Sequence, residues 1–502
     1  MKKILSLTMA AVLATGLYSC ENYLDVNDNP NYPTEDNLSS ELLLPALEMN
    51  LAASYGNFLR IVGGYMSQQY SQTFGTSNYI DYSQFIINDS RVNSLGYTQL
   101  YLRVVSNSEA LLSKSEEDGD WGTYLAATTL RGYALTTMVD CFDSIPYTEA
   151  VAGITQPKYD DGRTVYNGVI AEIDNALSKV DASDAVVTNF LFPGDKASSW
   201  IGFANALKLK LYTRISNVDE SVLPKIAEII NSGNLPSKDV AIKGCWTPNS
   251  GSENPFYAEE FATNFGSTQV NVVANIALVN TMQTSGYTDP RLAVFFNKNG
   301  DGKYVGGVSG TNFSVAPDLF NDKSFSRPAM AYDSPVYFIT LADIEFFKAE
   351  YYARTGDQAN AKTCYENAIR ASFATAGVEG ADANIAAYPY EADNWKKSIG
   401  LAKWLALSGV DNFEAWCELR RLRYPAFDES INGTLIFNED SKEYHPEVYK
   451  PGTLYTPIKV SSFIGNNKIL ERFPHASSSV SNNSNCPSPS KEIFTMPVFW
   501  AK

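Results

Sequence analysis

Cys20 is the residue best placed for a chemical modification, because it closes a short apolar N-terminus. Lys2 and Lys3 give this segment positive charge, and residues 4–17 are apolar but too few to cross about 30 Å of hydrocarbon. Residues 17–20, with the sequence LYSC, have the form of a lipobox, in which the cysteine follows a small residue. The pattern therefore predicts an exported protein that is cleaved before Cys20.

After such a cleavage Cys20 would be the N-terminus and would carry acyl chains. Each acyl methylene that enters a bilayer contributes about 0.8 kcal/mol, so the chains would hold the protein on a membrane. We expect residues 1–19 to be a lipoprotein signal peptide and residues 20–37, which are rich in Asn, Asp and Pro, to be a lipidated tether. An ordinary secretory signal that ends by chance in a cysteine is the alternative.

Two loop regions combine aromatic rings with amide side chains, at residues 64–96 and 244–266. This mixture suits a sugar, because a pyranose presents C–H groups that stack on a flat ring and hydroxyls that need polar partners. The candidate ligand-binding residues are Trp246, Tyr257, Tyr79 and Tyr82 as stacking platforms, with Asn78 and Asn254 as polar partners. Ordinary loop packing is the alternative for each of them.

Catalytic chemistry has little support in the sequence. The only histidines are His445 and His475, and no GxSxG, HExxH or CxxC motif occurs. A glycosidase needs only two carboxylates about 5 to 10 Å apart, so the 56 acidic residues leave that alternative open. Residues 297–302 have the outline of a calcium loop, but its twelfth position is Val308 rather than Glu. We predict no catalytic residue, no metal site and no cofactor.

The composition restricts the partners and the redox state. Lys and Arg number 39 against 56 Asp and Glu, and the net charge of −17 argues against nucleic acid. The 30 Tyr, 26 Phe and 7 Trp, with 19% charged residues, suit a packed, secreted protein that binds a neutral ligand. After Cys20, five cysteines remain without metal-binding spacing. Cys141, Cys364 and Cys417 lie in helical patterns, so we expect free thiols in the core.

Residues 341–374 carry the pattern of a tetratricopeptide helix pair. Small residues at regular spacing let two antiparallel helices approach, tyrosines fill the groove between them, and a glycine permits the tight turn. The residues of this pattern are Ala349, Tyr352, Gly356, Ala361, Tyr365 and Ala368. One such unit needs neighbours to cover its apolar face.

Less regular helix pairs and long loops complete the predicted fold. The partner helices are expected at residues 123–140 with 165–180 and 200–216 with 220–231, and the long irregular stretches at 64–96, 233–266, 297–333 and 424–497. A short β signal at residues 304–307, after a turn-rich segment, predicts a small hairpin. We therefore predict a mainly α fold: a tetratricopeptide-repeat-like helical scaffold with long irregular loops and a few short β-hairpins.

Several motifs, taken in order, resemble those of the SusD/RagB family, in its shorter SusD-like branch, over essentially the whole mature length. They are RGY at 131–133, MVD at 138–140, IPYTEA at 145–150, FANALKLKLYTR at 203–214, DPR at 289–291 and EAWCELRRLRYP at 414–425. Near the C-terminus, residues 470–475 match the family pattern only in part, and residues 498–500 differ from its final motif.

The resemblance implies a single SusD-like domain over residues 38–502 and a nutrient-binding lipoprotein on the outer face of the outer membrane. Its partner would be a SusC-type TonB-dependent transporter, to which it would deliver a captured glycan or oligosaccharide by a lid-like motion. Family members also handle peptides, so a peptide cargo is an alternative. Both candidate loops lie roughly where family members place ligand contacts. A tetratricopeptide scaffold that binds other proteins is a third hypothesis.

Most of the family-like motifs also have a purely structural interpretation. The arginines on otherwise apolar helices are expected to fork onto carboxylates or carbonyls, because a guanidinium near a core needs several acceptors. These arginines are Arg131, Arg214, Arg420 and Arg421. The segment 289–291 is expected to be a turn with a bidentate arginine, because proline prevents a continued helix.

Overall fold

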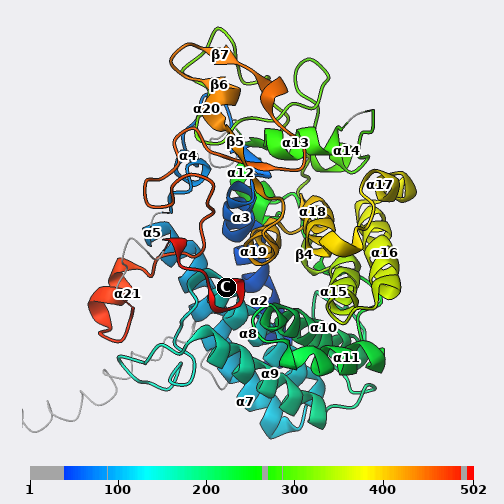
Figure 1. Cartoon of the computed structure of the whole chain (residues 1–502). Coiled ribbons are helices and arrows are strands. Elements are labelled where there is room, and N and C mark those ends of the chain that lie inside the picture. Colours follow the sequence, from blue (N-terminus) through cyan, green and yellow to red (C-terminus); the bar gives the residue numbers. More distant parts are fainter. Residues whose placement is uncertain (1–38, 88, 263–269, 285, 488–493) are drawn as a thin grey trace, which may run out of the picture.

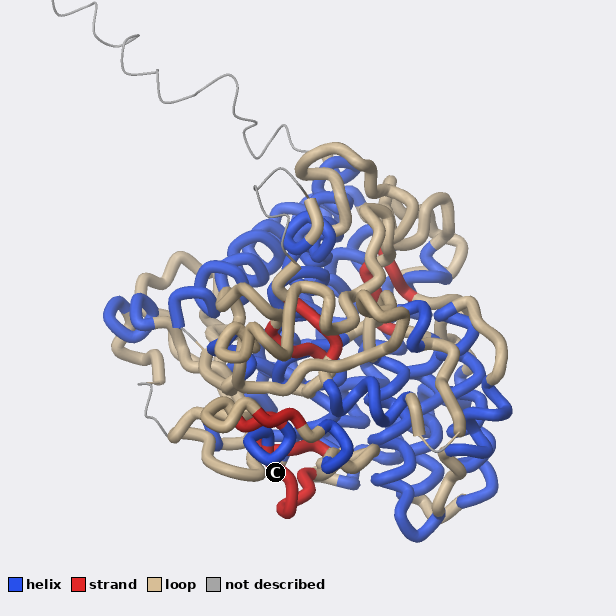
Figure 2. The backbone as a smooth tube through the Cα atoms, turned by 90° about the horizontal axis from the view of Figure 1, so that it is seen from above, coloured by secondary structure: helices blue, strands red, loops and turns tan. Residues whose placement is uncertain are grey.

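The computed structural model describes residues 39–502 except 88, 263–269, 285 and 488–493, and it does not describe the side chains of residues 90, 93 and 95. The predicted signal peptide, the tether and Cys20 lie outside the described residues. Helices form the frame, and short strands lie among irregular segments (Figure 2). Within the described part of the chain, no helix is both long and apolar enough to cross a bilayer.

Three antiparallel helix pairs form the frame, as the sequence predicts. They are α8 (Trp121–Phe142) with α9 (Gly162–Lys179), α10 (Ala197–Ser216) with α11 (Leu223–Ser232), and α15 (Leu341–Arg354) with α16 (Gln358–Ala376). Helix α10 contacts both α8 and α15, so the pairs stack into one layer along the lower and right side of Figure 1. The predicted tetratricopeptide pair is confirmed, and Gly356 turns between its helices with a positive φ of 84°.

Two central helices lie between this layer and the loops. Helices α3 (Arg60–Met66) and α19 (Asn412–Leu422) cross closely, because Gly63 has no side chain. A Cβ atom at Gly63 would lie 2.4 Å from the carbonyl oxygen of Asn412 and 2.5 Å from the Cα of Phe413. The other helices of this region are α2 (Ser40–Ser54), η3 (Tyr55–Leu59), η5 (Tyr101–Ser106), α7 (Asn107–Asp118) and α18 (Trp395–Leu407).

Shorter helices lie within the long connecting segments. Many of these segments lie around α20 at the top of Figure 1. The α-helices among them are α4 (Ile80–Ser83), α5 (Asp89–Arg91), α6 (Thr98–Leu100), α12 (Pro255–Glu260), α13 (Ile276–Met282), α14 (Leu292–Phe295), α17 (Ala381–Ala387), α20 (Gly433–Ile436) and α21 (Ser477–Asn482). The remaining elements are the π-helix η4 (Val92–Tyr97), which joins α5 to α6, and the 3-10 helices η6 (Glu220–Val222), η8 (Ala392–Asn394), η9 (Pro446–Val448) and η11 (Phe499–Ala501).

The strands form four two-stranded sheets. Three pairs are antiparallel: β1 (Tyr70–Gln72) with β3 (Val272–Ala274), β2 (Val240–Ile242) with β4 (Val336–Ile339), and β6 (Phe437–Asn438) with β7 (Glu443–Tyr444). The fourth pair, β5 (Phe427–Asn432) with β8 (Leu454–Thr456), is parallel. Only β6 and β7 are consecutive along the chain, so among the described strands only this pair is a hairpin.

The hairpin predicted at residues 304–307 is wrong. The backbone groups of this stretch bond to segments that are distant along the chain: the carbonyl of Val305 accepts from Ser326, and the N–H of Gly307 donates to Ala274. The turn before it fits the sequence interpretation, because the side-chain oxygen of Asn299 accepts from two backbone N–H groups of residues 301–303 at 3.0 Å.

Arg214 on α10 is the centre of a buried ionic network. Its guanidinium binds Asp140 of α8 and donates to Glu414 of α19 at 2.6 Å. The hydroxyl of Tyr166 on α9 and the indole of Trp500 also donate to Asp140, the indole at 2.9 Å. The network therefore ties the repeat helices to α19 and to the C-terminal turn η11.

A second part of the network joins α15, α18 and α19. Arg421 forks onto both carboxylate oxygens of Glu350 and also binds Glu418, at distances from 2.5 to 3.0 Å. Lys403 on α18 lies 3.2 Å from Glu418. These four side chains are almost fully buried. Because a buried charge needs compensation, the cations fix how the three helices pack.

Two neighbouring carboxyl groups of the network, Asp411 and Glu414, have pKa values shifted in opposite directions. Burial acts to raise the pKa of Glu414, but the cations Arg214 and Lys210 lower it to about 2. Burial and the charge of Glu414 raise the pKa of Asp411 to about 7. Glu414 is therefore the ionised partner that the cations require.

The expectations for the arginines, for the turn 289–291 and for the cysteines are confirmed. Arg131 binds Glu109 at 3.0 Å, and Arg420 donates to the carbonyls of Asp140 and Glu471. In the turn 289–291, Arg291 binds both carboxylate oxygens of Asp289. All five described cysteines are free, and Cys141, Cys364 and Cys417 are buried.

We predict that Arg214→Met destabilises the protein strongly. The substitution leaves Asp140 without its buried cation and removes one of the three cations within 4 Å of Glu414, a change that costs about 3–5 kcal/mol of unfolding free energy. Urea unfolding followed by circular dichroism measures the loss. The control is Arg370→Met, because Arg370 pairs with Asp382, whose side chain is 86% exposed; it should cost less than about 1 kcal/mol. Equal losses in both variants would contradict the role of the network.

We predict that His475 makes the protein less stable as the pH falls. This ring stacks on Phe142 and is 2% exposed. Burial, with the charge of Arg472, lowers its pKa to about 4. In the unfolded chain this histidine takes up a proton near pH 6.5, whereas in the folded protein it stays neutral down to about pH 4. The free energy of unfolding therefore falls by about 1.4 kcal/mol per pH unit as the pH is lowered from 6.5 to 4. Unfolding of His475→Phe across this range should lack that contribution.

The exposed His445 provides the matched control. His445→Phe removes a histidine whose side chain is 51% exposed without touching the packed ring of His475, so the variant should keep the loss of stability that His475 causes between pH 6.5 and 4. A His475→Phe profile that runs parallel to the unchanged protein would exclude the mechanism.

Candidate functional site

A polar pocket of about 260 Å³ lies between the central helices and the first predicted loop. Its walls come from η3, α3, the segment around α4, α5 and α12. The lining residues are Asn57, Phe58, Ile61, Asn78, Tyr79, Tyr82, Arg91 and Glu259. Three of the six predicted ligand-binding residues, Asn78, Tyr79 and Tyr82, are therefore brought together.

The loop that carries these residues is held by strand β1. The side-chain oxygen of Gln72, at the end of β1, accepts from the backbone N–H of Tyr79 at 2.9 Å. Strand β1 is itself paired with β3, so the start of α4 has a fixed position relative to α3. The pocket is thus built on hydrogen-bonded backbone rather than on a free loop.

Tyr79 and Tyr82 pack on each other. Their rings are stacked with centroids 5.6 Å apart and an interplanar angle of 8°, and the edge of Tyr65 meets both. Tyr79 is 5% exposed and Tyr82 is 3% exposed. Both rings line the pocket. Neither has an exposed face on which a sugar could stack, which differs from their predicted role as stacking platforms.

Charged groups complete the pocket wall. The guanidinium of Arg91 lies 5.9 Å from the centroid of each of the two rings, and the hydroxyl of Tyr79 donates to Glu259 at 3.3 Å. Burial and the charges of Glu260 and Glu259 raise the pKa of Tyr79 well above its usual range. Burial also raises the pKa of Tyr82, which Arg91 offsets only in part. The phenols therefore stay protonated at neutral pH and act as hydrogen-bond donors.

Tyr257 lies on α12 but does not line this pocket. It is half-buried and stacks on Phe261, with ring centroids 5.7 Å apart. Tyr257 and Glu259 are two residues apart on one helix, and residues at that spacing do not share a face. The second predicted loop thus contributes Glu259 to the pocket, whereas Tyr257 faces a different surface.

The expectations for Asn254 and Trp246 need correction, because both side chains are used in packing. Asn254 is fully buried and caps α12: its side-chain oxygen accepts from the N–H groups of Phe256 and Tyr257, and its amide donates to the carbonyl of Ser334 at 2.8 Å. Trp246 is 7% exposed and belongs to the hydrophobic core. Neither side chain presents hydrogen-bonding groups or a ring face at the surface.

Sequence reasoning missed Arg91, Glu259 and Asn57. These residues come from three separate elements, and no local pattern marks them as neighbours. The sequence Asn254-Pro255, however, was a readable signal for the cap, since asparagine before proline is typical of a helix start.

The chemical groups of the pocket suit binding. Glu259 is the only carboxylate among the described lining residues, whereas hydrolysis of a glycosidic bond commonly uses a pair. No group of three or more potential metal ligands occurs among the residues that the structure describes. The pocket therefore offers neutral and charged hydrogen-bonding groups around aromatic edges.

The fold and this pocket define a helical-repeat protein with a loop-borne candidate ligand pocket. The model of the SusD-like family, described as "starch-binding associating with outer membrane", matches residues 31–441. The chain therefore belongs to the SusD/RagB family, within its SusD-like group. No curated protein matches the chain.

Solved structures share the fold over nearly the whole chain. A SusD homolog from Bacteroides uniformis has 21% identity and a TM-score of 0.74, covering 92% of this chain and 99% of its own. A chitin-binding SusD homolog from Flavobacterium johnsoniae has 20% identity and a TM-score of 0.67, covering 91% and 98%. A SusD homolog from Bacteroides thetaiotaomicron has 17% identity and a TM-score of 0.68, covering 89% and 93%. At these identities the likeness shows the fold.

Proposed function

We propose that this protein captures a glycan or oligosaccharide at the cell surface and delivers it to a SusC-type TonB-dependent transporter in the outer membrane. The observation that carries the proposal is the match of residues 31–441 to a family described as starch-binding and outer-membrane-associated. The chitin-binding relative from Flavobacterium johnsoniae supports a carbohydrate ligand.

The polar pocket supplies the groups that such a ligand needs. The exposed amide of Asn78 and the charged ends of Arg91 and Glu259 can donate to and accept from sugar hydroxyls. Tyr79 and Tyr82 line the same wall and supply aromatic edges and protonated hydroxyls. A ligand held there would be bound and released without a chemical change.

Two alternatives remain distinct from glycan capture. The opposite charges of Arg91 and Glu259 would also suit a peptide, so a peptide cargo on the same fold is the second candidate. A secreted glycosidase would need a second carboxylate beside Glu259. A glycan array with product analysis separates the three: binding without turnover supports capture, turnover supports the glycosidase, and the absence of any glycan binding favours the peptide.

We predict that Asn78→Ala weakens glycan binding by about threefold to tenfold, because a hydrogen bond contributes about 0.5–1.5 kcal/mol. Calorimetry with the best ligand from the array measures the effect. Asn249→Ala is the matched control, because it removes an exposed amide from the other predicted loop. If Asn78→Ala and Asn249→Ala bind equally well, the pocket is not the glycan site.

We predict that Cys20 anchors the protein by lipid. The variant Cys20→Ala should move the protein from the membrane fraction to the soluble fraction, because no acyl chain would then be attached. Cell fractionation with immunoblotting measures the distribution, and Cys245→Ala, which changes a cysteine far along the chain, is the control. A Cys20→Ala protein that stays with the membrane would refute the anchor.

Co-purification of a large barrel protein with the unchanged chain tests the transporter partner.

A further inference from the structure

Two adjoining cavities open on either side of Phe427, which begins strand β5. The first has a volume of about 340 Å³ and the second about 570 Å³. They share Phe427, Glu429 and the segment 425–426, so they form one interrupted cleft, here named the Phe427 cleft. Both volumes fall in the range of about 300–1,000 Å³ that is typical of small-ligand sites. The cleft shares no lining residue with the polar pocket around Tyr79.

The aromatic rings of the Phe427 cleft are more open than those of the polar pocket. Phe427, Tyr424 and Tyr388 line the larger cavity, and all three are half-buried, whereas Tyr79 and Tyr82 are at most 5% exposed. A half-buried ring is anchored on one side and presents apolar surface on the other. This is the condition that stacking of a sugar C–H face requires.

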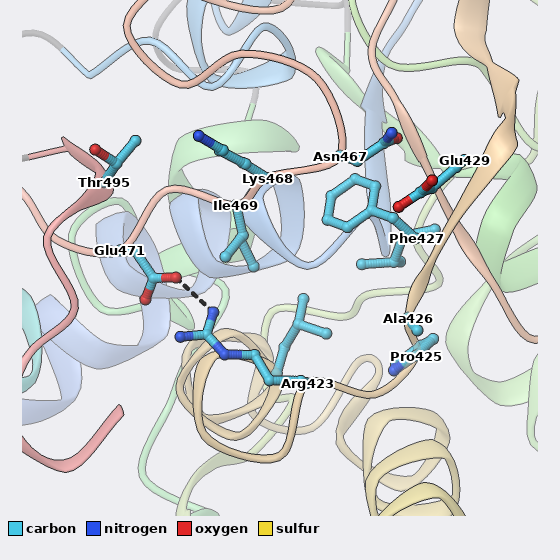
Figure 3. Close-up of a pocket in the computed structure, with 12 residues that line it drawn as sticks. Arg423, Pro425, Ala426, Phe427, Glu429, Asn467, Lys468, Ile469, Glu471 and Thr495 are labelled. Carbon is cyan, nitrogen blue, oxygen red and sulfur yellow. Dashed lines mark hydrogen bonds and ion pairs between the residues drawn. The ribbon is translucent and has the colours of Figure 1, made fainter. Parts of the chain in front are cut away.

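Polar groups surround the ring of Phe427 in the smaller cavity. Figure 3 shows the amide of Asn467 and the carboxylate of Glu429 beside the ring, with Lys468 on the opposite rim. The lining of this cavity also includes the apolar side chains of Ile469 and Leu454. Amide, carboxylate and ammonium groups beside an apolar ring face can satisfy the hydroxyls of a sugar stacked on that ring.

The walls of the cleft are held in place by hydrogen bonds. In the larger cavity the hydroxyl of Tyr388 donates to the carbonyl of Thr281 at 2.6 Å, and the N–H of Gly452 donates to the hydroxyl of Thr281 at 2.8 Å. In the smaller cavity Arg423 binds Glu471, and its other end donates to the carbonyl of Ala501 at 2.9 Å. A site with fixed walls loses little conformational entropy when it binds.

The backbone around β5 keeps the cleft open. Strand β5 pairs with β8 at its two ends, Phe427 with Leu454 and Asn432 with Thr456, and the register shifts between them. The intervening residues Asp428 and Glu429 therefore do not pair with β8. Glu429 is exposed and lines both cavities.

We propose that the Phe427 cleft is a second oligosaccharide-binding site, in which successive sugar units contact Phe427 and Tyr424. This inference rests on the proposed function, because it assigns the same ligand class to a separate surface. A chain that spans both cavities would pass over Phe427, with hydroxyls reaching Asn467 on one side and Thr284 and Thr453 on the other. Two sites on one molecule would hold a polymer more firmly than either site alone.

The test is calorimetry of the purified full chain with maltoheptaose and with chitohexaose. Phe427→Leu keeps a similar apolar volume but removes the ring, and it should weaken binding at the cleft by about tenfold. Phe427→Trp keeps a ring and should retain the affinity. Tyr212→Leu, which removes a half-buried ring from α10 outside both cavities, should bind like the unchanged chain.

The outcomes separate this inference from the proposed function. If Phe427→Leu binds both glycans like the unchanged chain while Asn78→Ala does not, the second site is wrong and glycan capture stands. If neither glycan binds the unchanged chain, the Phe427 cleft is not an oligosaccharide site, whereas the proposed function falls only when no glycan on the array binds. If Phe427→Leu and Phe427→Trp lose affinity equally, the ring does not stack on the ligand and the inference also fails.

Discussion

The frame depends on two buried carboxylates of α19, Glu414 and Glu418, which can lie inside the protein only because cations from neighbouring helices compensate them. Arg214 approaches from α10 and Lys403 from α18. A buried charge without a partner costs several kcal/mol, whereas an apolar replacement of the whole network could be as stable. What the ionic contacts add is geometry, because helices α10 and α18 must each place a cation close to a carboxylate of α19. The apolar surface that these helices bury then stabilises this packing.

The position of the candidate pocket follows from α19 through a chain of buried amides. Asn412, at the start of α19, donates to Gln69 at 2.6 Å and accepts from the hydroxyl of Tyr70 at 3.1 Å. Gln69 in turn donates to the carbonyl of Trp404 on α18 at 2.7 Å. These bonds fix the start of β1, and Gln72 at its end holds Tyr79. Buried amides satisfy backbone groups that no helix or long strand could satisfy, so an irregular loop can be rigid.

The helical frame could be predicted because its signals are local. Small residues and tyrosines at tetratricopeptide spacing, with Gly356 between them, specify a helix pair without reference to the rest of the chain. The site is different, because burial of a loop residue depends on segments far away. Trp246 looks the same in the sequence whether its ring packs inward or faces solvent, and Arg91 meets Tyr79 only after β1 and α5 are placed. The family resemblance supplied the order of the elements but not the direction of these side chains.

The two candidate surfaces differ in what a ligand must displace. At the polar pocket, a sugar that stacks on Tyr79 or Tyr82 must first move Arg91. Arg91 lies where α5 continues into η4, and its side chain also hydrogen-bonds to Tyr82. Moving this side chain gives up a cation–π contact of about 0.5–1 kcal/mol and one hydrogen bond, which the hydrogen bonds of a ligand must replace. At the Phe427 cleft the rings are already accessible and their walls are fixed. We infer that the pocket adapts to its ligand whereas the cleft is preformed, so the two surfaces would differ in binding kinetics even for the same sugar.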